Sequence, residues 1–391
     1  MLDLTRLAAQ MEGIGQYLNE ESAAARRRLE KAQQVLEEAL PHQAALVERQ
    51  QIWRDRLGFT AAVPLEPLDT RRAIAAAPPL HTVLATDGSQ IAPSHHEIAY
   101  CYLINVGRIV LHYGQNRHPL LDSIPEVFYR PQDLYVSRQW GIRTEEWMGY
   151  QRTVSEAVVL AELAHQLSPT HPTLAMVDGS LIHWFLEPLP GEARDRLLPP
   201  ILQAWDILRQ ARIPLVGYLS ASRSGEALNM LRLHTCPHPQ PDCFTHCPGQ
   251  TEQAPCQVFA PLRDTALWSV LLKPGQRSPL WRSAAKILAQ YGDHPVYFCY
   301  IHVGTEVARL EFPQWVIQEP DLLETALTLA VEQVQKGYGY PVALAEAHNQ
   351  AVVRGGDRAR FFSLLEQQMI RAGLRNIGTS YKETRKRGSI A

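Results

Sequence analysis

Two aspartates begin the same three-residue motif, and each follows a short apolar run. Asp87 begins Asp-Gly-Ser after HTVLAT, and Asp178 begins it after TLAMV. An aspartate at the end of a buried strand stands at the edge of a sheet, where the glycine lets the backbone turn and a ligand approach. Asp-Gly is also a common turn dipeptide, so a purely structural turn is the alternative for either motif alone. The repetition of the motif favours a site of paired carboxylates.

A third acid projects from the apolar side of a predicted helix. The pattern predicts this helix over 145–167, with Glu156 within about 60° of Leu163 in the apolar stripe. A carboxylate in that stripe is costly unless it is paired or holds a metal. Glu162 lies about 120° away on a solvated face, so Glu156 is the better candidate. The alternative is a buried ion pair with Arg152, one helical turn earlier.

A tyrosine and a histidine mark a predicted late helix over 341–353. Tyr340 precedes Pro341, which suits the first position of a helix, and His348 follows that proline by seven residues. Apolar residues flank His348 at helical spacing, so we expect the imidazole to face the core side. The alternative to a ligand is a core histidine with satisfied hydrogen bonds.

A separate segment, 234–257, concentrates cysteine and histidine. Four of the six cysteines fall within 21 residues, and three histidines are interleaved with them. Four thiolates suffice for zinc or for an iron–sulfur cluster. The spacings of six, three and eight intervening residues fit no standard zinc ribbon, so a loop of reduced thiols is the alternative. The four candidate ligands are Cys236, Cys243, Cys247 and Cys256.

The elements that must position these residues follow from the hydrophobic pattern. Residues 1–62 predict a helical arm that is either a solvated, partner-facing hairpin or a helix packed on the main domain. Prolines mark a linker around residues 62–80. Beyond it we predict one domain over 80–375 with the Cys/His-rich insertion, then a basic tail over 376–391. The predicted strands lie at 81–91, 98–113 (two strands hinged at 105–107), 173–181, 214–220 and 295–311, and the remaining helices at 194–212, 321–336 and 357–372.

The composition excludes several classes of protein. No stretch reaches 18 consecutive apolar residues, and the first twenty positions carry acids where a secretory signal carries bases, so we expect no membrane span and no export. Six cysteines in 391 residues are too sparse for a disulfide scaffold, which predicts a cytoplasmic location. With 38 basic and 40 acidic side chains, any contact with DNA must be local rather than a coat of positive charge.

With these residues identified, the chain resembles the NurA family of DNA-end-processing nucleases. The order of the acids, on a first strand, on a helix after a three-strand meander and at the end of the next strand, also resembles ribonuclease H-like folds. The resemblance implies an α/β, ribonuclease H-like fold close to the Argonaute nuclease domain, with a mixed central sheet flanked by helices. It spans roughly residues 80–375. The matching segments are LATDGSQIAPSHHE, Arg152 with Glu156, AMVDGSL, ARLEFPQW and GYPVALAEAH, of which the last is the most specific.

The resemblance also implies the site. The family's catalytic set corresponds here to Asp87, Glu156, Asp178, Tyr340 and His348. Phosphodiester hydrolysis needs an activated water and neutralised phosphate charge, which divalent cations supply; carboxylates with one imidazole suit Mn²⁺ or Mg²⁺. The two aspartates, the glutamate and the histidine are the expected metal ligands. Tyr340 is expected either to hydrogen-bond the scissile phosphate or to pack at the helix start. Outside this set, we predict phosphate contacts at Arg223 and Arg309, with a surface or structural role as the alternative.

The function implied is a metal-dependent DNA nuclease. We expect a 5′-to-3′ exonuclease, with single-strand endonuclease activity as an addition, in double-strand break end resection and repair. The partners implied are DNA, a HerA-type hexameric ATPase and a second copy of the chain. The sequence has no Gly-x-x-x-x-Gly-Lys-[Ser/Thr] loop, so ATP-driven movement must come from another protein. The alternative is a non-catalytic nucleic-acid-binding assembly subunit, which would have lost one or more site acids; none is replaced. A phosphohydrolase with an aspartyl nucleophile lacks its Asp-x-Asp motif.

Overall fold

The chain folds into two compact units, each assembled from separate stretches of sequence. The computed structural model describes residues 3–11, 13–94, 97–167 and 170–373, so the predicted basic tail at 376–391 lies outside the described residues. Unit 1 comprises Met1–Ile74, Leu219–Leu288 and Pro295–Glu311, and unit 2 comprises Ala75–Tyr218, Ala289–His294 and Phe312–Ala391. This partition differs from the predicted one, because the N-terminal helices and the Cys/His-rich segment belong to the same unit.

Unit 2 is built on a mixed sheet. Strands β3 (His81–Ile91), β4 (Tyr102–Tyr113) and β5 (Leu120–Phe128) form an antiparallel meander. On the other side of β3, β6 (Thr173–Asp178) pairs parallel to it, and β7 (Leu215–Leu219) pairs parallel to β6. The strand order is therefore β7-β6-β3-β4-β5. A three-strand meander is present as predicted, but its third strand is β5, which was not predicted, because the two strands expected within 98–113 are the single strand β4.

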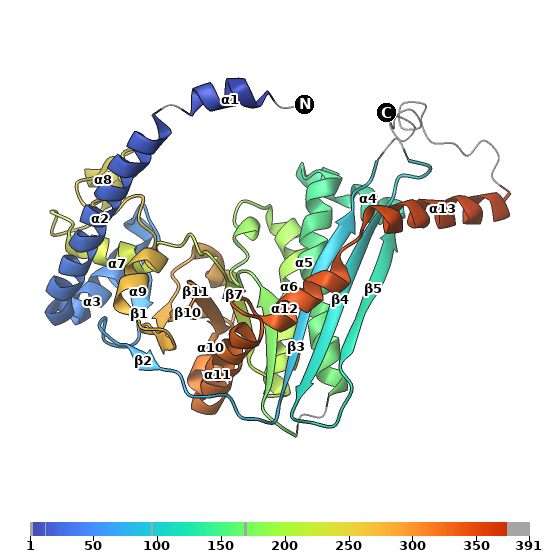
Figure 1. Ribbon diagram of the computed structural model, residues 1–391. Helices are drawn as coiled ribbons and strands as arrows, with labels where there is room; N and C mark the ends of the chain where they lie inside the picture. The colour runs from blue at the N-terminus through green and yellow to red at the C-terminus, as the bar shows by residue number, and fades with distance from the viewer. Residues whose placement is uncertain (1–2, 12, 95–96, 168–169, 374–391) are drawn as a thin grey trace. The chain divides into compact units, whose positions relative to one another are not determined.

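Helices cover both faces of this sheet, as Figure 1 shows, with α12 on one side of β3 and β4 and with α5 and α6 on the other. The three predicted helices that carry or flank the candidate site are all present. They are α5 (Thr144–Gln166), α12 (Val342–Ala351) and α13 (Gly355–Arg371). The other helices of unit 2 are α4 (Pro131–Tyr135), α6 (Gly191–Gln210), α10 (Gln314–Gln318) and α11 (Pro320–Lys336).

The inner strands of unit 2 are apolar throughout because both of their faces are covered. Residues 83–85 of β3 and 174–176 of β6 are completely buried. This is the reason that the sequence there shows continuous apolar runs rather than alternation. The first charged residues after these runs are Asp87 and Asp178, and both have some solvent exposure.

The predicted strand at 81–91 is confirmed as β3, but the turn expected at Asp87-Gly88-Ser89 and the hinge expected at 105–107 are wrong. β3 runs straight through the motif to Ile91, paired with β4 along its whole length. β4 is a single strand with no hinge at 105–107. In both cases a continuous ladder of backbone hydrogen bonds, from β3 to β4 and from β4 to β5, outweighs a local turn preference. The second motif does turn as predicted: β6 ends at Asp178, and Gly179 has a φ of +107°.

Unit 1 combines short strands with helices from distant parts of the chain. Its strands run in the order β1-β9-β10-β11; β8 also pairs with β10, and β2 pairs with β8. They are β1 (Val63–Pro64), β2 (Arg72–Ala73), β8 (Gln276–Arg277), β9 (Trp281–Arg282), β10 (Val296–His302) and β11 (Val307–Pro313). The helices are α1 (Leu4–Gln10), α2 (Ile14–Ala39), α3 (Gln43–Trp53), α7 (Glu226–His234), α8 (Cys243–His246) and α9 (Asp264–Leu271). The predicted linker at 62–80 therefore contributes two short strands.

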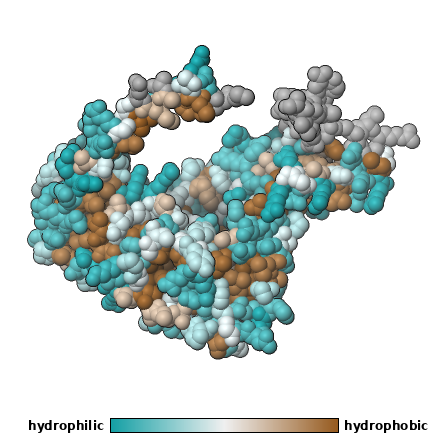
Figure 2. All heavy atoms as spheres, viewed as in Figure 1, coloured by the Kyte–Doolittle hydropathy of each residue, from teal (hydrophilic) through white to brown (hydrophobic). Residues whose placement is uncertain are grey.

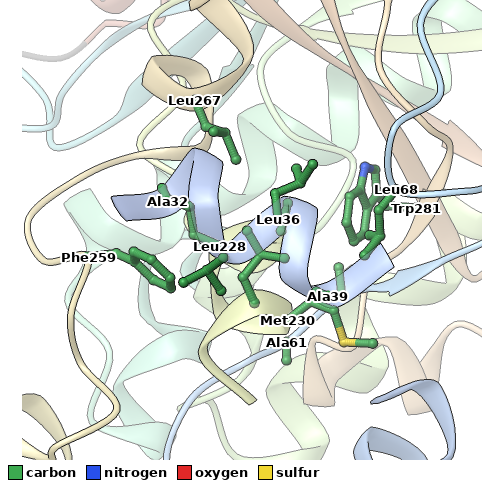
Figure 3. Close-up of a cluster of buried hydrophobic side chains, with 14 of the residues drawn as sticks. Ala32, Leu36, Ala39, Ala61, Leu68, Leu228, Met230, Phe259, Leu267 and Trp281 are labelled. Carbon is green, nitrogen blue, oxygen red and sulfur yellow. The ribbon is translucent and has the colours of Figure 1, made fainter. Parts of the chain in front are cut away.

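The second half of α2 is part of the core of unit 1. Figure 3 shows Leu36 and Ala39 among Leu228 and Met230 of α7 and the Trp281 ring, all buried. For this half the structure supports the alternative of a helix packed on the rest of its unit. The beginning of α2 differs. Figure 2 shows apolar side chains along α1 and the first turns of α2, where the exposed ones are Leu4, Met11, Ile14, Tyr17 and Leu18.

No helix among the described residues is long and apolar enough to cross a membrane.

His183, which follows β6, predicts an acid-sensitive step in stability. Its ring lies among Phe185, Trp205 and Tyr291, and its Nε2 has no hydrogen-bond partner among the described residues. Burial lowers the pKa of His183 to about 4. The pKa of His183 is lower in the folded than in the unfolded protein. The stability that comes from burying the neutral ring is therefore fully present above about pH 6.5 and is lost as pH falls toward 4. We expect a loss of about 2–3 kcal/mol over that window.

The measurement is urea unfolding of wild type and of His183→Leu at several pH values. The variant should lose less stability than wild type between pH 6.5 and 4. A matched His118→Gln variant, at an exposed histidine, should follow the wild-type profile. Parallel profiles for wild type and His183→Leu would contradict the prediction.

Candidate active site

The sheet register places the two motif aspartates side by side. β3 and β6 run parallel with Thr86 opposite Val177, so the next residues, Asp87 and Asp178, are neighbours on the same face. Asp178 is the last residue of its strand and also pairs with Tyr218 of β7. The predicted pair of carboxylates therefore forms, although only one of the two lies at a strand end.

Helix α12 reaches this face because Gly107 of β4 has no side chain. Gly107 pairs with Asp87 across the ladder and so faces the same way. A Cβ at Gly107 would lie 2.3 Å from the carbonyl oxygen of Ala347 and 2.6 Å from the backbone nitrogen of Ala351. The end of the helix is also tied to the sheet, since Asn105 donates a hydrogen bond of 2.8 Å to the Ala351 carbonyl. The backbone of α12 thus packs directly on β4.

This packing brings His348 to Asp87. The His348 Nδ1 lies 2.8 Å from the Asp87 Oδ2. The prediction that the imidazole faces the core is wrong: its side chain is 67% exposed. The helix buries Ala343, Ala347 and Ala351, and His348 lies 100° around the helix from Ala347, at the edge of that buried stripe. It therefore stands at the boundary between sheet and solvent, where a ligand or catalytic group is useful.

Glu156 approaches from the opposite face of the sheet. Thr86 donates a hydrogen bond of 3.0 Å to the Glu156 carbonyl, which fixes α5 against β3. A Cβ at Gly88 would lie 2.4 Å from the Glu156 Oε1 and 2.6 Å from the Arg152 Cγ. The missing side chain at Gly88 is therefore what lets this carboxylate come close to the strand beside Asp87.

Glu156 forms an ion pair and also lies near the two aspartates, while its role as a metal ligand stays a prediction. Its Oε1 lies 3.2 Å from the Arg152 Nε, so the predicted alternative ion pair exists. Even so, the pKa of Glu156 rises to about 8, because burial raises it and the charges of Asp87 and Asp178 add to the rise, while Arg152 opposes them. A carboxyl with this pKa is largely protonated at neutral pH. Such a strongly shifted group beside two further acids is typical of a functional site.

Asp178 shows the same crowding. Burial raises its pKa, a hydrogen bond from Tyr340 and the nearby His348 lower it, and the charge of Asp87 raises it further, with a net rise. Tyr340 lies just before α12, with its ring edge-on to Tyr218 at 5.7 Å between centroids. The tyrosine therefore belongs to the site through Asp178. Its predicted contact with the scissile phosphate stays a prediction.

The donor types fit a hard divalent cation, namely three carboxylates and one imidazole around adjacent strand positions. In the structure, however, each has a protein partner: His348 for Asp87, Arg152 for Glu156 and Tyr340 for Asp178. Accordingly, no group of three or more His, Cys, Asp or Glu side chains in the described residues is arranged to hold an ion. Metal binding would have to replace some of these pairs.

Arg309 does not contact substrate phosphate. It is 1% exposed on β11 of unit 1, where its guanidinium contacts Glu226 at 2.9 Å and Glu311 at 2.8 Å. The structural alternative is therefore correct for this residue, since a buried guanidinium held by two carboxylates cannot reach a phosphate of DNA in the solvent. Arg223 lies exposed between β7 and α7, and its predicted phosphate contact stays a prediction.

Gly88 and Gly107 are the functional positions that the sequence prediction missed. The sequence does contain a signal for them, because a glycine inside a strand pattern often marks close approach of another backbone or of a ligand. The Asp-Gly-Ser motif and the hinge expected at 105–107 instead suggest turns at these two glycines.

Together, a meander with two parallel strands, helices on both faces and acids on adjacent strands define a ribonuclease H-like fold with a carboxylate site, as predicted. The sequence model of the NurA domain matches residues 81–353, which is most of the chain. The chain therefore belongs to the NurA family. It is also similar to the crystal structure of the NurA nuclease from Sulfolobus solfataricus, with a TM-score of 0.54 and 10% identity over 95% of this chain and 98% of that one. No curated protein matches in sequence.

Proposed function

We propose that this protein is a divalent-metal-dependent DNA nuclease that hydrolyses phosphodiester bonds. The observation that carries the proposal is the gathering of Asp87 and Asp178 on adjacent strands, with Glu156 and His348 brought to them from helices on the two faces. The similarity in fold to a protein named as a nuclease supports it. All the acids of the site are retained, which argues against the alternative of a non-catalytic binding subunit.

Asp87, Asp178, Glu156 and His348 are the residues that would hold the metal. Bound Mg²⁺ or Mn²⁺ would neutralise phosphate charge and favour ionised water. The protein groups have their own tasks. Because Asp87 engages the Nδ1 of His348, the Nε2 is left to meet a water or phosphate oxygen. Tyr340 keeps Asp178 oriented through its hydroxyl. Glu156 must lose its proton to act as a ligand, and a nearby cation favours that loss.

The finer assignment rests on the family resemblance. We propose 5′-to-3′ exonuclease activity, with single-strand endonuclease activity, in double-strand break end resection, together with a HerA-type hexameric ATPase and as a homodimer. The absence of a phosphate-binding loop in the sequence supports a separate motor. The exposed apolar side chains of α1 and the start of α2 support a role for this segment in contacts with another chain.

The test is cleavage of end-labelled linear DNA by the purified full chain. Treatment with EDTA should reduce cleavage to the buffer background, and Mn²⁺ or Mg²⁺ in excess should restore it. The physical reason is that three acids crowded at one place repel phosphate until a cation is bound. Cleavage that survives EDTA would contradict the metal dependence. Binding of DNA without cleavage, with either cation and with a motor ATPase present, would favour the binding subunit.

A further inference from the structure

The structure gathers the four clustered cysteines of unit 1 around one cavity. Cys236 lies just after α7, Cys243 begins α8, Cys247 follows α8, and Cys256 follows a short turn. All four are free thiols, and all four line a cavity of about 10 Å³. The other lining residues include Phe59, His238 and His246. The spacing along the sequence looked irregular, but in the fold the segment closes on itself.

A buried arginine points into this cluster. Arg232 of α7 is 1% exposed, and its Nε lies 3.2 Å from the Cys256 Sγ. Its guanidinium also donates to the Thr251 carbonyl and stacks 4.1 Å from the Phe59 ring centroid. No carboxylate in the described part of the chain forms an ion pair with Arg232. Its permanent positive charge is therefore buried beside the Cys256 thiol as the candidate counter-charge. A thiolate would balance this charge, whereas a neutral thiol would not.

The segment is also anchored on the side of Cys236. Arg49 of α3 donates to the carbonyl of Leu233 at 2.9 Å and to that of His238. Near Cys243, Asp242 caps α8 and forms an ion pair of 2.5 Å with Arg56. The backbone on both sides of the cluster is therefore held in place by side chains from the N-terminal helices, as a ligand cage requires.

We infer that Cys236, Cys243, Cys247 and Cys256 bind a metal centre as thiolates, and that this centre is an iron–sulfur cluster. Binding releases the thiol protons, and the resulting negative charge is what the buried Arg232 lacks. A single zinc ion needs its ligands about 2.3 Å from one point. No group of three or more described His, Cys, Asp or Glu side chains is arranged to hold a metal ion, so the four thiols as they stand do not form a single-ion site. A cluster brings its own sulfide core and suits four thiols around a cavity. This inference is independent of the proposed nuclease activity.

The experiment is purification of the full chain without oxygen, followed by iron, acid-labile sulfide and zinc analysis and visible absorption spectroscopy. We expect about two to four iron atoms per chain, an equal amount of sulfide, and an absorption band that dithionite bleaches. Protein without iron and zinc, both as purified and after anaerobic reconstitution, would overturn the inference. One zinc per chain without iron would overturn the assignment of the metal centre as an iron–sulfur cluster.

Variants test the ligands and the arginine separately. The iron content of Cys247→Ala and of Cys256→Ala should be at least about tenfold lower than that of wild type. Cys101→Ala, at a buried cysteine of unit 2, should have the wild-type iron content. A chelator should remove iron from Arg232→Met about tenfold faster than from wild type. Removal from Arg232→Lys should be close to the wild-type rate, because lysine keeps the positive charge. Wild-type iron content in both cysteine variants would overturn the assignment. If a variant does not fold, Mössbauer spectra of wild-type protein loaded with ⁵⁷Fe decide, since iron outside a thiolate-ligated cluster would overturn it.

Discussion

Asp178→Asn and Asp87→Asn should each lower the rate of DNA cleavage at least about 1,000-fold, which corresponds to about 4 kcal/mol of transition-state stabilisation. The substitution keeps the shape of the side chain and removes its charge. The asparagine at 178 can still accept the hydrogen bond from Tyr340, so the loss reports the missing carboxylate rather than a displaced tyrosine. The measurement is single-turnover cleavage of end-labelled DNA with saturating Mn²⁺.

The same Asp178→Asn variant should be at least as stable as wild type. Because the pKa of Asp178 is raised in the folded state, its ionised form is disfavoured there at neutral pH. Removing the charge should therefore leave the free energy of unfolding unchanged or raise it. A drop in activity together with a clear drop in stability would point to a structural aspartate instead.

Glu162→Gln is the matched control for these variants. It removes a carboxylate from α5, but from its exposed face. This variant should cleave DNA at the wild-type rate. Near-wild-type cleavage by both aspartate variants would reject the assignment of the site, whichever metal is present.

Gly107→Ala should reduce cleavage about 100-fold without unfolding the protein. A Cβ at this position would meet the backbone of α12 at Ala347 and Ala351, and backbone cannot rotate aside as a side chain can. The helix must shift away from β4, and His348 must move with it relative to Asp87. A displacement of about 1 Å at a catalytic group can cost about 100-fold in rate. Overpacking should cost about 1–3 kcal/mol of stability, which thermal unfolding will measure.

A double-mutant cycle shows whether Gly107 acts through His348. If it does, Gly107→Ala combined with His348→Ala should be no slower than His348→Ala alone, because the group that the shift displaces is already missing. Independent, additive losses would mean that Gly107 does not act by positioning the histidine. Gly149→Ala is the control, since a Cβ at that helical glycine of α5 would meet no atom within 4 Å.

Local sequence determined much of the site because its rules act over a few residues. The helical period separates Glu156 from Glu162, and the structure agrees that only Glu156 lies among the other acids. The apolar runs before Asp87 and Asp178 predict two buried strands, and both exist. The family resemblance then named Tyr340 and His348, and both lie in the same unit beside these aspartates.

Only the tertiary structure decided which groups touch. The run of β3 through Asp87 to Ile91 depends on its pairing with β4, which no local pattern contains. Arg309 is buried between two glutamates, one of them from a helix more than eighty residues earlier in the chain. His348 is exposed because α12 packs Ala347 and Ala351 against Gly107 on a distant strand, which leaves the histidine at the edge of the buried stripe. These outcomes depend on contacts between residues far apart in sequence. The sequence by itself therefore determined most of the helices and strands and the kinds of side chain at the site. Tertiary packing decided the register of the strands and the partner of each side chain.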